Sequence, residues 1–136
     1  MLDWLDTCLR GPRNLYFDHL RADGSLDRTA WSYNQGSVIG ADVLLYRLTG
    51  DGAALANAEA VAVASLPYLA PGTREPPEFV AVLARHLLEL GAVDGDPHWR
   101  DAVQMWVDAT WLRPHARLLT HAALAQVYAL LATTAS

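Results

Sequence analysis

The 136-residue sequence has little of what several common protein classes need. Cys8 is its only cysteine, so an intrachain disulfide is excluded. Its five histidines have no spacing typical of a structural zinc site, and we expect neither a metal nor another cofactor. The ten basic residues are scattered and the formal net charge is −5. This distribution offers no basic surface to a polyanion and argues against a nucleic-acid partner.

Both ends of the sequence also lack the patterns that direct a chain to a membrane. The first six residues, MLDWLD, hold two acids where a signal peptide needs a basic region. Residues 118–136 carry no formal charge, but His121, Gln126, Thr133 and Thr134 make this stretch a poor membrane span. The sequence as written therefore predicts a soluble, cytoplasmic chain without membrane contact.

What the chain does contain is material for a helical core. Hydrophobic residues make up 52% of it, and its length predicts one domain over residues 1–136. Stop and cap signals, such as Asp96 followed by Pro97, divide it into short segments. The segments predict helices over 2–10, 37–49, 52–66, 77–90, 97–112 and 120–132. Because most connections are short, we expect an all-α fold built from three αα-hairpins, with 37–49, 78–90 and 120–132 as the inner helices.

Residues 13–35 interrupt this helical pattern. They contain an Asp-Gly turn at 23–24, and apolar side chains flank that turn, which predicts a short irregular hairpin. A non-helical excursion of this length in a compact helical protein is more often functional than idle. Asp23 and Asp27 are expected to be turn residues, with Asp27 a candidate ligand contact.

The end of this excursion, WSYNQG at 31–36, carries the most chemical information. Trp31 and Tyr33 offer flat apolar faces for a sugar ring, while Asn34 and Gln35 supply donors and acceptors for hydroxyl groups. We place this motif immediately before a helix, whose N-terminus adds unpaired N–H groups. The alternative interpretation is that Trp31 and Tyr33 are core aromatics and that Asn34 caps the helix.

The string WSYNQGSVIGADVLLYRLTGD is similar to the YNQG stretch of glycoside hydrolase family 76, and the preceding LYFDHLRADGSLD resembles that family's turn segment. FVAVLARHL and HAALAQVYALL resemble two further helices of the family. The resemblance implies the C-terminal half of an (α/α)6 toroid that acts on α-1,6-linked mannose. It assigns substrate contacts to Trp31, Tyr33, Asn34 and Gln35.

The sequence departs from the family pattern in three places. Val80 and Ala81 stand where the family has lysine and glycine, and Asp42 falls at an apolar position. Asp42 is either an additional substrate contact or an ordinary hydrogen-bonded acid. The family's two catalytic aspartates are adjacent and lie in the other half, and no two acids are adjacent in this sequence. We therefore assign no catalytic residue.

Three functions remain open at this stage. The chain is a family 76 glycosidase half that is inactive alone, or a non-catalytic glycan-binding protein derived from that fold. A third, less supported option is a sugar epimerase that uses histidines. The expected ligand is a mannose-containing oligosaccharide. Because three hairpins leave the inner helices open on one side, we also expect a homodimer or a missing N-terminal half to cover them.

Overall fold

The computed structural model describes residues 2–113 and 117–133, and in these it contains six α-helices, one 3-10 helix and two short strands. In chain order they are α1 (Leu2–Cys8), β1 (His19–Leu20), β2 (Leu26–Asp27), α2 (Ser32–Thr49), α3 (Gly52–Ser65), η1 (Leu66–Leu69), α4 (Pro77–Asp94), α5 (Pro97–Trp111) and α6 (Leu118–Thr133). The all-α prediction is confirmed.

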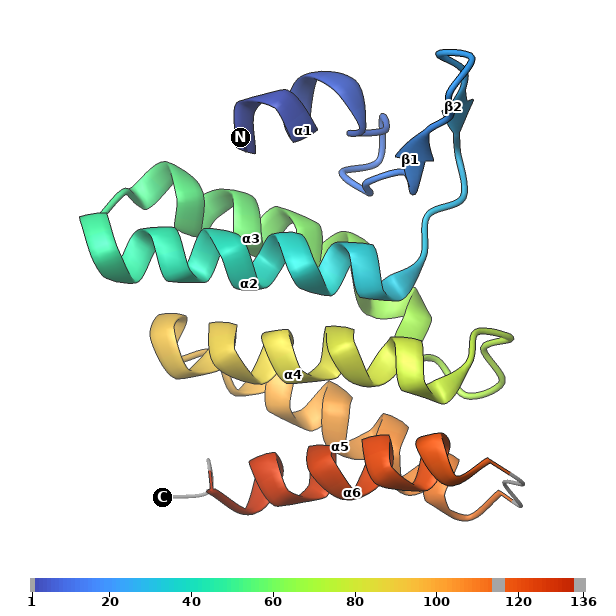
Figure 1. Ribbon diagram of the computed structural model, residues 1–136. Coiled ribbons are helices and arrows are strands. Elements are labelled where there is room, and N and C mark those ends of the chain that lie inside the picture. Colours follow the sequence, from blue (N-terminus) through green and yellow to red (C-terminus); the bar gives the residue numbers. More distant parts are fainter. Residues whose placement is uncertain (1, 114–116, 134–136) are drawn as a thin grey trace.

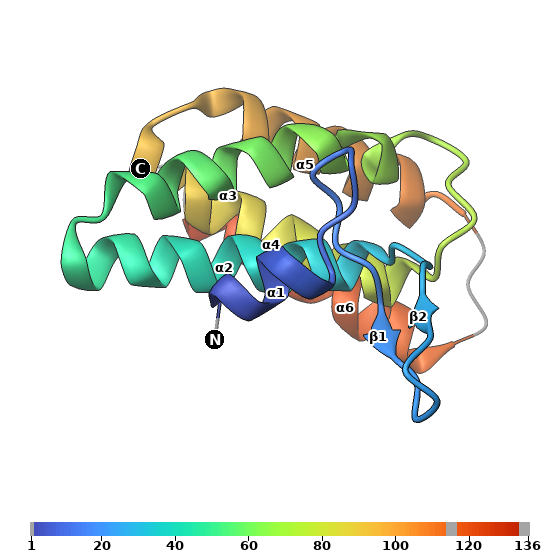
Figure 2. The ribbon, with the colours of Figure 1, turned by 90° about the horizontal axis from the view of Figure 1, so that it is seen from above.

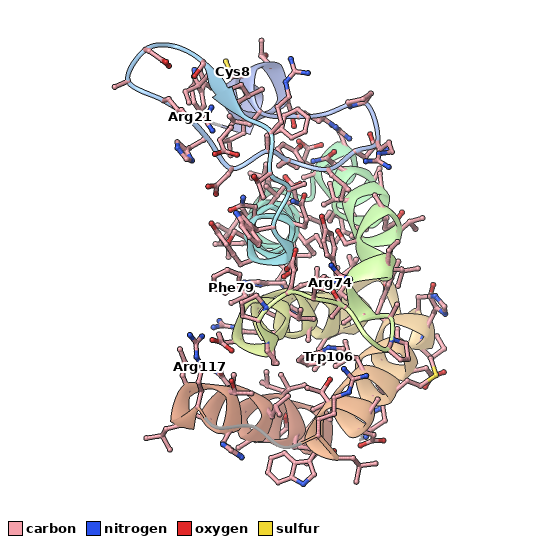
Figure 3. All side chains as sticks on the ribbon, turned by 90° about the vertical axis from the view of Figure 1, so that its right-hand side faces the viewer. Cys8, Arg21, Arg74, Phe79, Trp106 and Arg117 are labelled. Atoms are coloured by element: carbon pink, nitrogen blue, oxygen red, sulfur yellow. The ribbon has the colours of Figure 1, made fainter. Side chains whose placement is uncertain are left out.

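The helices form two curved layers. α2, α4 and α6 lie side by side, with α2 packed on α4 and α4 packed on α6 (Figure 1). α3 and α5 cover the outer side of this layer, as the view from above shows (Figure 2). Seen end-on, the layer of α2, α4 and α6 curves inward (Figure 3). These three are the helices predicted to be inner, and the arrangement is that of part of an (α/α)6 toroid.

All three inner helices run in the same direction. α3 returns the chain between α2 and α4, and α5 returns it between α4 and α6, so the N-terminal ends of the three inner helices lie together on the right of Figure 1. The β1–β2 hairpin and the loop before α4 lie at this same end. Segments far apart in sequence therefore meet there.

The core lies between the two layers. Ile39 of α2 and Leu83, Leu87 and Leu90 of α4 are fully buried, and these two helices pack on each other. Each such side chain contributes about 1.5–3 kcal/mol by leaving water. Trp99 and Trp106 of α5 are also buried. The hydrophobic effect at the α2–α4 contact thus fixes the layer on which the site is built.

The β1–β2 hairpin confirms the predicted turn. His19 pairs with Asp27 and Leu20 with Leu26, and Gly24 at the turn has φ 82°, which favours glycine. The Asp23 carboxylate accepts hydrogen bonds from the N–H and hydroxyl of Ser25. Asp23 is thus the local turn residue that the sequence predicted.

The start of α2 corrects the sequence prediction. The helix begins at Ser32, not at residue 37, so the YNQG motif forms its first turn instead of preceding it. The main-chain N–H of Ser32 donates to both carboxylate oxygens of Glu75, at 3.0 and 3.3 Å. A cap supplied from 43 positions away leaves no local signal.

Gly36 consequently lies inside α2, and the close packing of α2 on α4 explains why a glycine occupies this position. A Cβ atom at Gly36 would lie 2.8 Å from the Cα of Leu83 on α4. Glycine therefore lets the backbones of α2 and α4 approach each other directly. Gly91 was likewise predicted to end its helix, but α4 continues to Asp94 and Trp99 packs beside Gly91.

Candidate functional site

A polar and aromatic cluster lies at the N-terminal ends of the inner helices. We call it the rim cluster, and it consists of Asp18, Trp31, Tyr33, Asn34 and Phe79. The hairpin segment places Asp18, the first turn of α2 places Tyr33 and Asn34, and the first turn of α4 places Phe79. Phe79 and Arg117, which lies just before α6, are both on the inward-curving side in Figure 3. All five members are partly exposed.

Asp18 is the centre of the rim cluster. Its carboxylate accepts hydrogen bonds from the Tyr33 hydroxyl at 2.8 Å and from the Asn34 amide at 3.1 Å, and it contacts the His19 ring nitrogen at 2.9 Å. The hydrogen bond from Asn34, then those of His19 and Tyr33, hold the pKa of Asp18 below its usual value. Burial and the bond to Asp18 raise the pKa of Tyr33. The arrangement fixes a phenol, an amide and a carboxylate beside one another.

Phe79 holds the two aromatic side chains of the motif. Its ring packs edge-on against Tyr33, with ring centroids 4.9 Å apart, and against Trp31 at 5.7 Å. Such edge-to-face pairs contribute about 0.5–1.5 kcal/mol beyond the area they bury. Trp31 and Tyr33 keep partly exposed surfaces. Both rings thus pack against Phe79 of α4 and keep part of their surface open to solvent.

Gln35 lies beneath the rim cluster and not on its exposed surface. Its exposed fraction is 0%. Its Oε1 accepts from the Tyr16 main-chain N–H, and its Nε2 donates to the carbonyl oxygens of Tyr16 and Trp31. An amide committed to three main-chain groups has no surface to offer a sugar. Gln35 supports the rim cluster from beneath.

Asp42 and Asp27 are also held by neighbours. Asp42 is 3% exposed, and its Oδ2 accepts from the Asn57 amide of α3 at 2.7 Å. Burial raises the pKa of Asp42. Asp27 accepts hydrogen bonds from the N–H and hydroxyl of Thr29 and forms an ion pair with Arg21 at 2.7 Å. Of the six residues predicted to bind substrate, the structure thus brings Trp31, Tyr33 and Asn34 together and leaves Gln35, Asp42 and Asp27 outside the exposed cluster.

A second polar contact joins α4 to α6 at the same end. Glu78 accepts from the Thr120 hydroxyl at 3.0 Å and from the Arg117 guanidinium at 3.1 Å. A hydrogen bond from its own main chain, with those from Thr120 and Arg117, holds the pKa of Glu78 below its usual value. Glu78 stays ionised at neutral pH and forms an ion pair with Arg117.

The inner face continues from the rim cluster along the helices. A groove of about 390 Å³ runs between α4 and α6, and another of about 390 Å³ runs between α2 and α4; Arg85 and His86 line both. The His86 ring contacts Glu89 at 2.7 Å and lies against Gly40, where any Cβ atom would collide with the imidazole. His86 is thus a hydrogen-bonded, partly buried histidine on the inner face.

Within residues 2–113 and 117–133, no group of three or more histidine, cysteine, aspartate or glutamate side chains is placed to hold a metal ion. In the same described part of the chain, no helix is both long and apolar enough to cross a membrane.

Sequence reasoning missed Asp18, Glu75 and Phe79 as members of the site. Asp18 was visible only as part of the family-like turn segment. Glu75 and Phe79 act through contacts more than 40 residues away in sequence, and no local pattern reveals such contacts.

Parallel inner helices, a second layer of outer helices and a polar cluster at the N-terminal ends of the inner layer define the chain as an α/α-toroid protein. The family model for glycosyl hydrolase family 76 matches residues 1–111, and the chain belongs to this family. No curated protein gives a significant match.

Three solved structures show the same fold. A family 76 glycoside hydrolase from a bovine strain of Bacteroides thetaiotaomicron is 22% identical with a TM-score of 0.84, and the match covers 98% of this chain and 37% of that one. A family 76 α-mannanase from Bacteroides thetaiotaomicron is 20% identical with a TM-score of 0.80, covering 98% and 44%. A protein from Listeria innocua is 23% identical with a TM-score of 0.77, covering 95% and 45%. The chain thus spans less than half the length of these structures.

Proposed function

We propose that the chain is the substrate-face part of a glycosidase that acts on α-1,6-linked mannose, and that the sugar lies across the rim cluster. The observation that carries this proposal is Asp18, which holds Tyr33 and Asn34 side by side next to Phe79. The exposed surfaces of Trp31 and Tyr33 suit the apolar face of a hexose, and the Asn34 and Asp18 polar atoms suit its hydroxyl groups. Family membership and the α-mannanase with the same fold support the sugar class.

We further propose that the chain binds substrate but does not cleave it alone. Glycoside hydrolysis needs two carboxyl groups about 5–9.5 Å apart, one of them a general acid. Asp23 and Asp27 are engaged by their own turns, and Asp18 is held ionised by three partners. The acidic pair then comes from residues outside this chain.

The inner face supports an assembly that completes the site. Leu44 and Leu119, which are 56% and 62% exposed, line the two grooves between the inner helices. Exposed apolar side chains grouped on one face favour a contact with another helical layer. We propose that residues 1–136 form one half-domain, covered either by a preceding half or by a second copy of the chain.

A non-catalytic glycan-binding protein is the second candidate, and the absence of adjacent acids in the sequence favours it. Isothermal titration with α-1,6-linked mannotriose tests both functions, with an α-1,4-linked glucose trimer as the control. A hydrolysis assay on the same samples then separates them, and light scattering gives the oligomeric state. Binding without turnover by the longest natural chain supports the second candidate. If that chain does not bind mannotriose, both candidate functions are wrong.

A further inference from the structure

A chain of polar contacts connects α1 to α2 and α3 at a distance from the rim cluster; it is buried at Tyr16 and Asp42 and exposed to solvent at Asp6. The Tyr16 hydroxyl donates to the Asp6 carboxylate of α1. The Asn57 amide of α3 lies between, 3.4 Å from the Tyr16 hydroxyl and 2.7 Å from Asp42 Oδ2. Tyr16 is 2% exposed and Asp42 is 3% exposed. Four side chains from four segments therefore form one chain of contacts, with the buried carboxyl group of Asp42 at its end.

Tyr16 links this chain of contacts to the rim cluster. The Tyr16 hydroxyl contacts Asp6 and Asn57. The main-chain N–H and carbonyl oxygen of Tyr16 are both hydrogen-bonded to the side chain of Gln35. The next residue, Phe17, donates its N–H to the carbonyl of Leu9 at 2.8 Å. Asp18, the centre of the rim cluster, follows directly. The position of Tyr16 thus fixes where the Asp18 carboxylate can reach.

We propose that Asp42 is a positioning residue, which acts through Asn57 and Tyr16 to set the place of Asp18 in the rim cluster, so that ligand binding responds to the charge state of a buried carboxyl group. The proposal has two halves. The binding half, that ligand affinity responds to Asp42, rests on the proposed function. The positional half, that Asp42 sets the place of Asp18, rests on the contacts alone.

The charges around Asp42 give the direction of the response. Burial is the largest cause of its raised pKa, and the charges of Asp6 and Asp51 also raise it. The hydrogen bond from Asn57 and the charge of Arg10 oppose them. Arg10 in turn lies 3.6 Å from Asp6 and 5.7 Å from the centre of the Tyr16 ring. Burial therefore favours the protonated form of Asp42 more strongly in the folded chain than in the unfolded one, and repulsion from the solvent-exposed Asp6 adds to this effect.

The sign of the effect follows. A carboxyl group whose pKa is raised on folding stabilises the fold at low pH, and this contribution is lost as pH rises through the raised pKa. Because burial outweighs the hydrogen bond from Asn57, which favours the ionised form, we expect the segment around Tyr16 to be held most firmly in acid and to loosen as Asp42 ionises. Asp42→Asn keeps the shape and the acceptor oxygen for Asn57 but cannot ionise.

Hydrogen–deuterium exchange of residues 9–20 in the full chain tests the positional half, from about pH 4 to about pH 8 after correction for intrinsic rates. In the unchanged protein, exchange of this segment should rise across that range, and Asp42→Asn should abolish the rise. Asp42→Ala should accelerate exchange roughly tenfold at every pH, and Asn57→Leu should do the same with Asp42 in place. The matched control is Asp101→Asn on the exposed face of α5, which should behave as the unchanged protein.

Titration with α-1,6-linked mannotriose across the same range tests the binding half. Affinity should fall with rising pH in the unchanged protein and stay level in Asp42→Asn. The proposal is overturned if Asp42→Asn keeps the original pH dependence of exchange, or if Asp42→Ala and Asn57→Leu leave residues 9–20 unaffected. If no variant binds mannotriose but exchange changes as expected, the proposed function fails while the positioning by Asp42 stands.

Discussion

The side chain of Gln35 holds both main-chain polar groups of Tyr16. Its Oε1 lies 2.7 Å from the Tyr16 nitrogen and its Nε2 lies 2.8 Å from the Tyr16 oxygen. The Gln35 amide thus forms the pair of hydrogen bonds that a neighbouring residue of a β-sheet would form with the main chain of Tyr16. The irregular segment before the hairpin is anchored to α2 by this pair, although the two residues are 19 positions apart.

Gln35→Ala should destabilise the fold by about 2–4 kcal/mol, because it leaves the buried N–H and carbonyl of Tyr16 without partners. Urea denaturation measures this loss. Gln126→Ala, at an exposed site on α6, is the control and should stay within about 0.5 kcal/mol.

Gln35→Glu separates hydrogen bonding from simple packing. Its carboxylate would face the carbonyl oxygens of Tyr16 and Trp31, which raises its pKa. The variant should therefore regain stability on acidification. Equal losses at low and neutral pH would show that shape alone matters at this position.

Gly36→Ala should cost about 1–3 kcal/mol, since its Cβ would press on the backbone of Leu83 and separate α2 from α4. Gly52→Ala, with nothing within 4 Å of the added atom, should be neutral or slightly stabilising. Thermal melts of the two variants compare them directly. An unaffected Gly36→Ala would contradict the close α2–α4 contact.

Tyr33→Phe and Asn34→Ala should weaken mannotriose binding by about fivefold to tenfold each, because each removes a hydrogen-bonding group from the rim cluster. The free energy of unfolding should change by less than about 2 kcal/mol. Titration and denaturation of the same samples separate the two effects. A large loss of stability with unchanged binding would show that these side chains serve only the core.

Asp18 should respond to pH in the opposite sense to Asp42. Hydrogen bonds lower its pKa, so its contribution to stability is present above the unfolded pKa and is lost as pH falls through the lower folded pKa. Asp18→Asn should be less stable than the unchanged chain at neutral pH, and the difference should shrink in acid. A difference that stays constant from about pH 7 to about pH 2 would contradict this assignment.

Local signals were sufficient for much of the helical layout. Asp96 was predicted to cap a helix, and its carboxylate accepts a hydrogen bond from the main-chain N–H of His98 in the first turn of α5. Asp51 caps α3 in the same way. The predicted start of α2 was wrong because the main-chain N–H of Ser32 is capped by Glu75, which lies in a loop distant in sequence.

The same distinction between local signals and distant contacts applies to the candidate site. Trp31, Tyr33 and Asn34 could be placed in one cluster from their spacing and the family-like motif. Gln35 has the same chemical groups as Asn34. Only the fold shows that the Gln35 amide is hydrogen-bonded to the main chain of Tyr16. Asp18 has nothing in its neighbours along the sequence to mark it as the acceptor for Tyr33 and Asn34.

The contact between Gly40 and His86 has a consequence for how related sequences vary. Any side chain at position 40 would occupy the space of the His86 ring. Homologues that carry alanine or a larger residue at position 40 should therefore carry a smaller or differently directed residue at position 86. The two positions are expected to change as a pair during evolution, and the Glu89 partner of His86 should become free to vary only in those lineages where the histidine is lost.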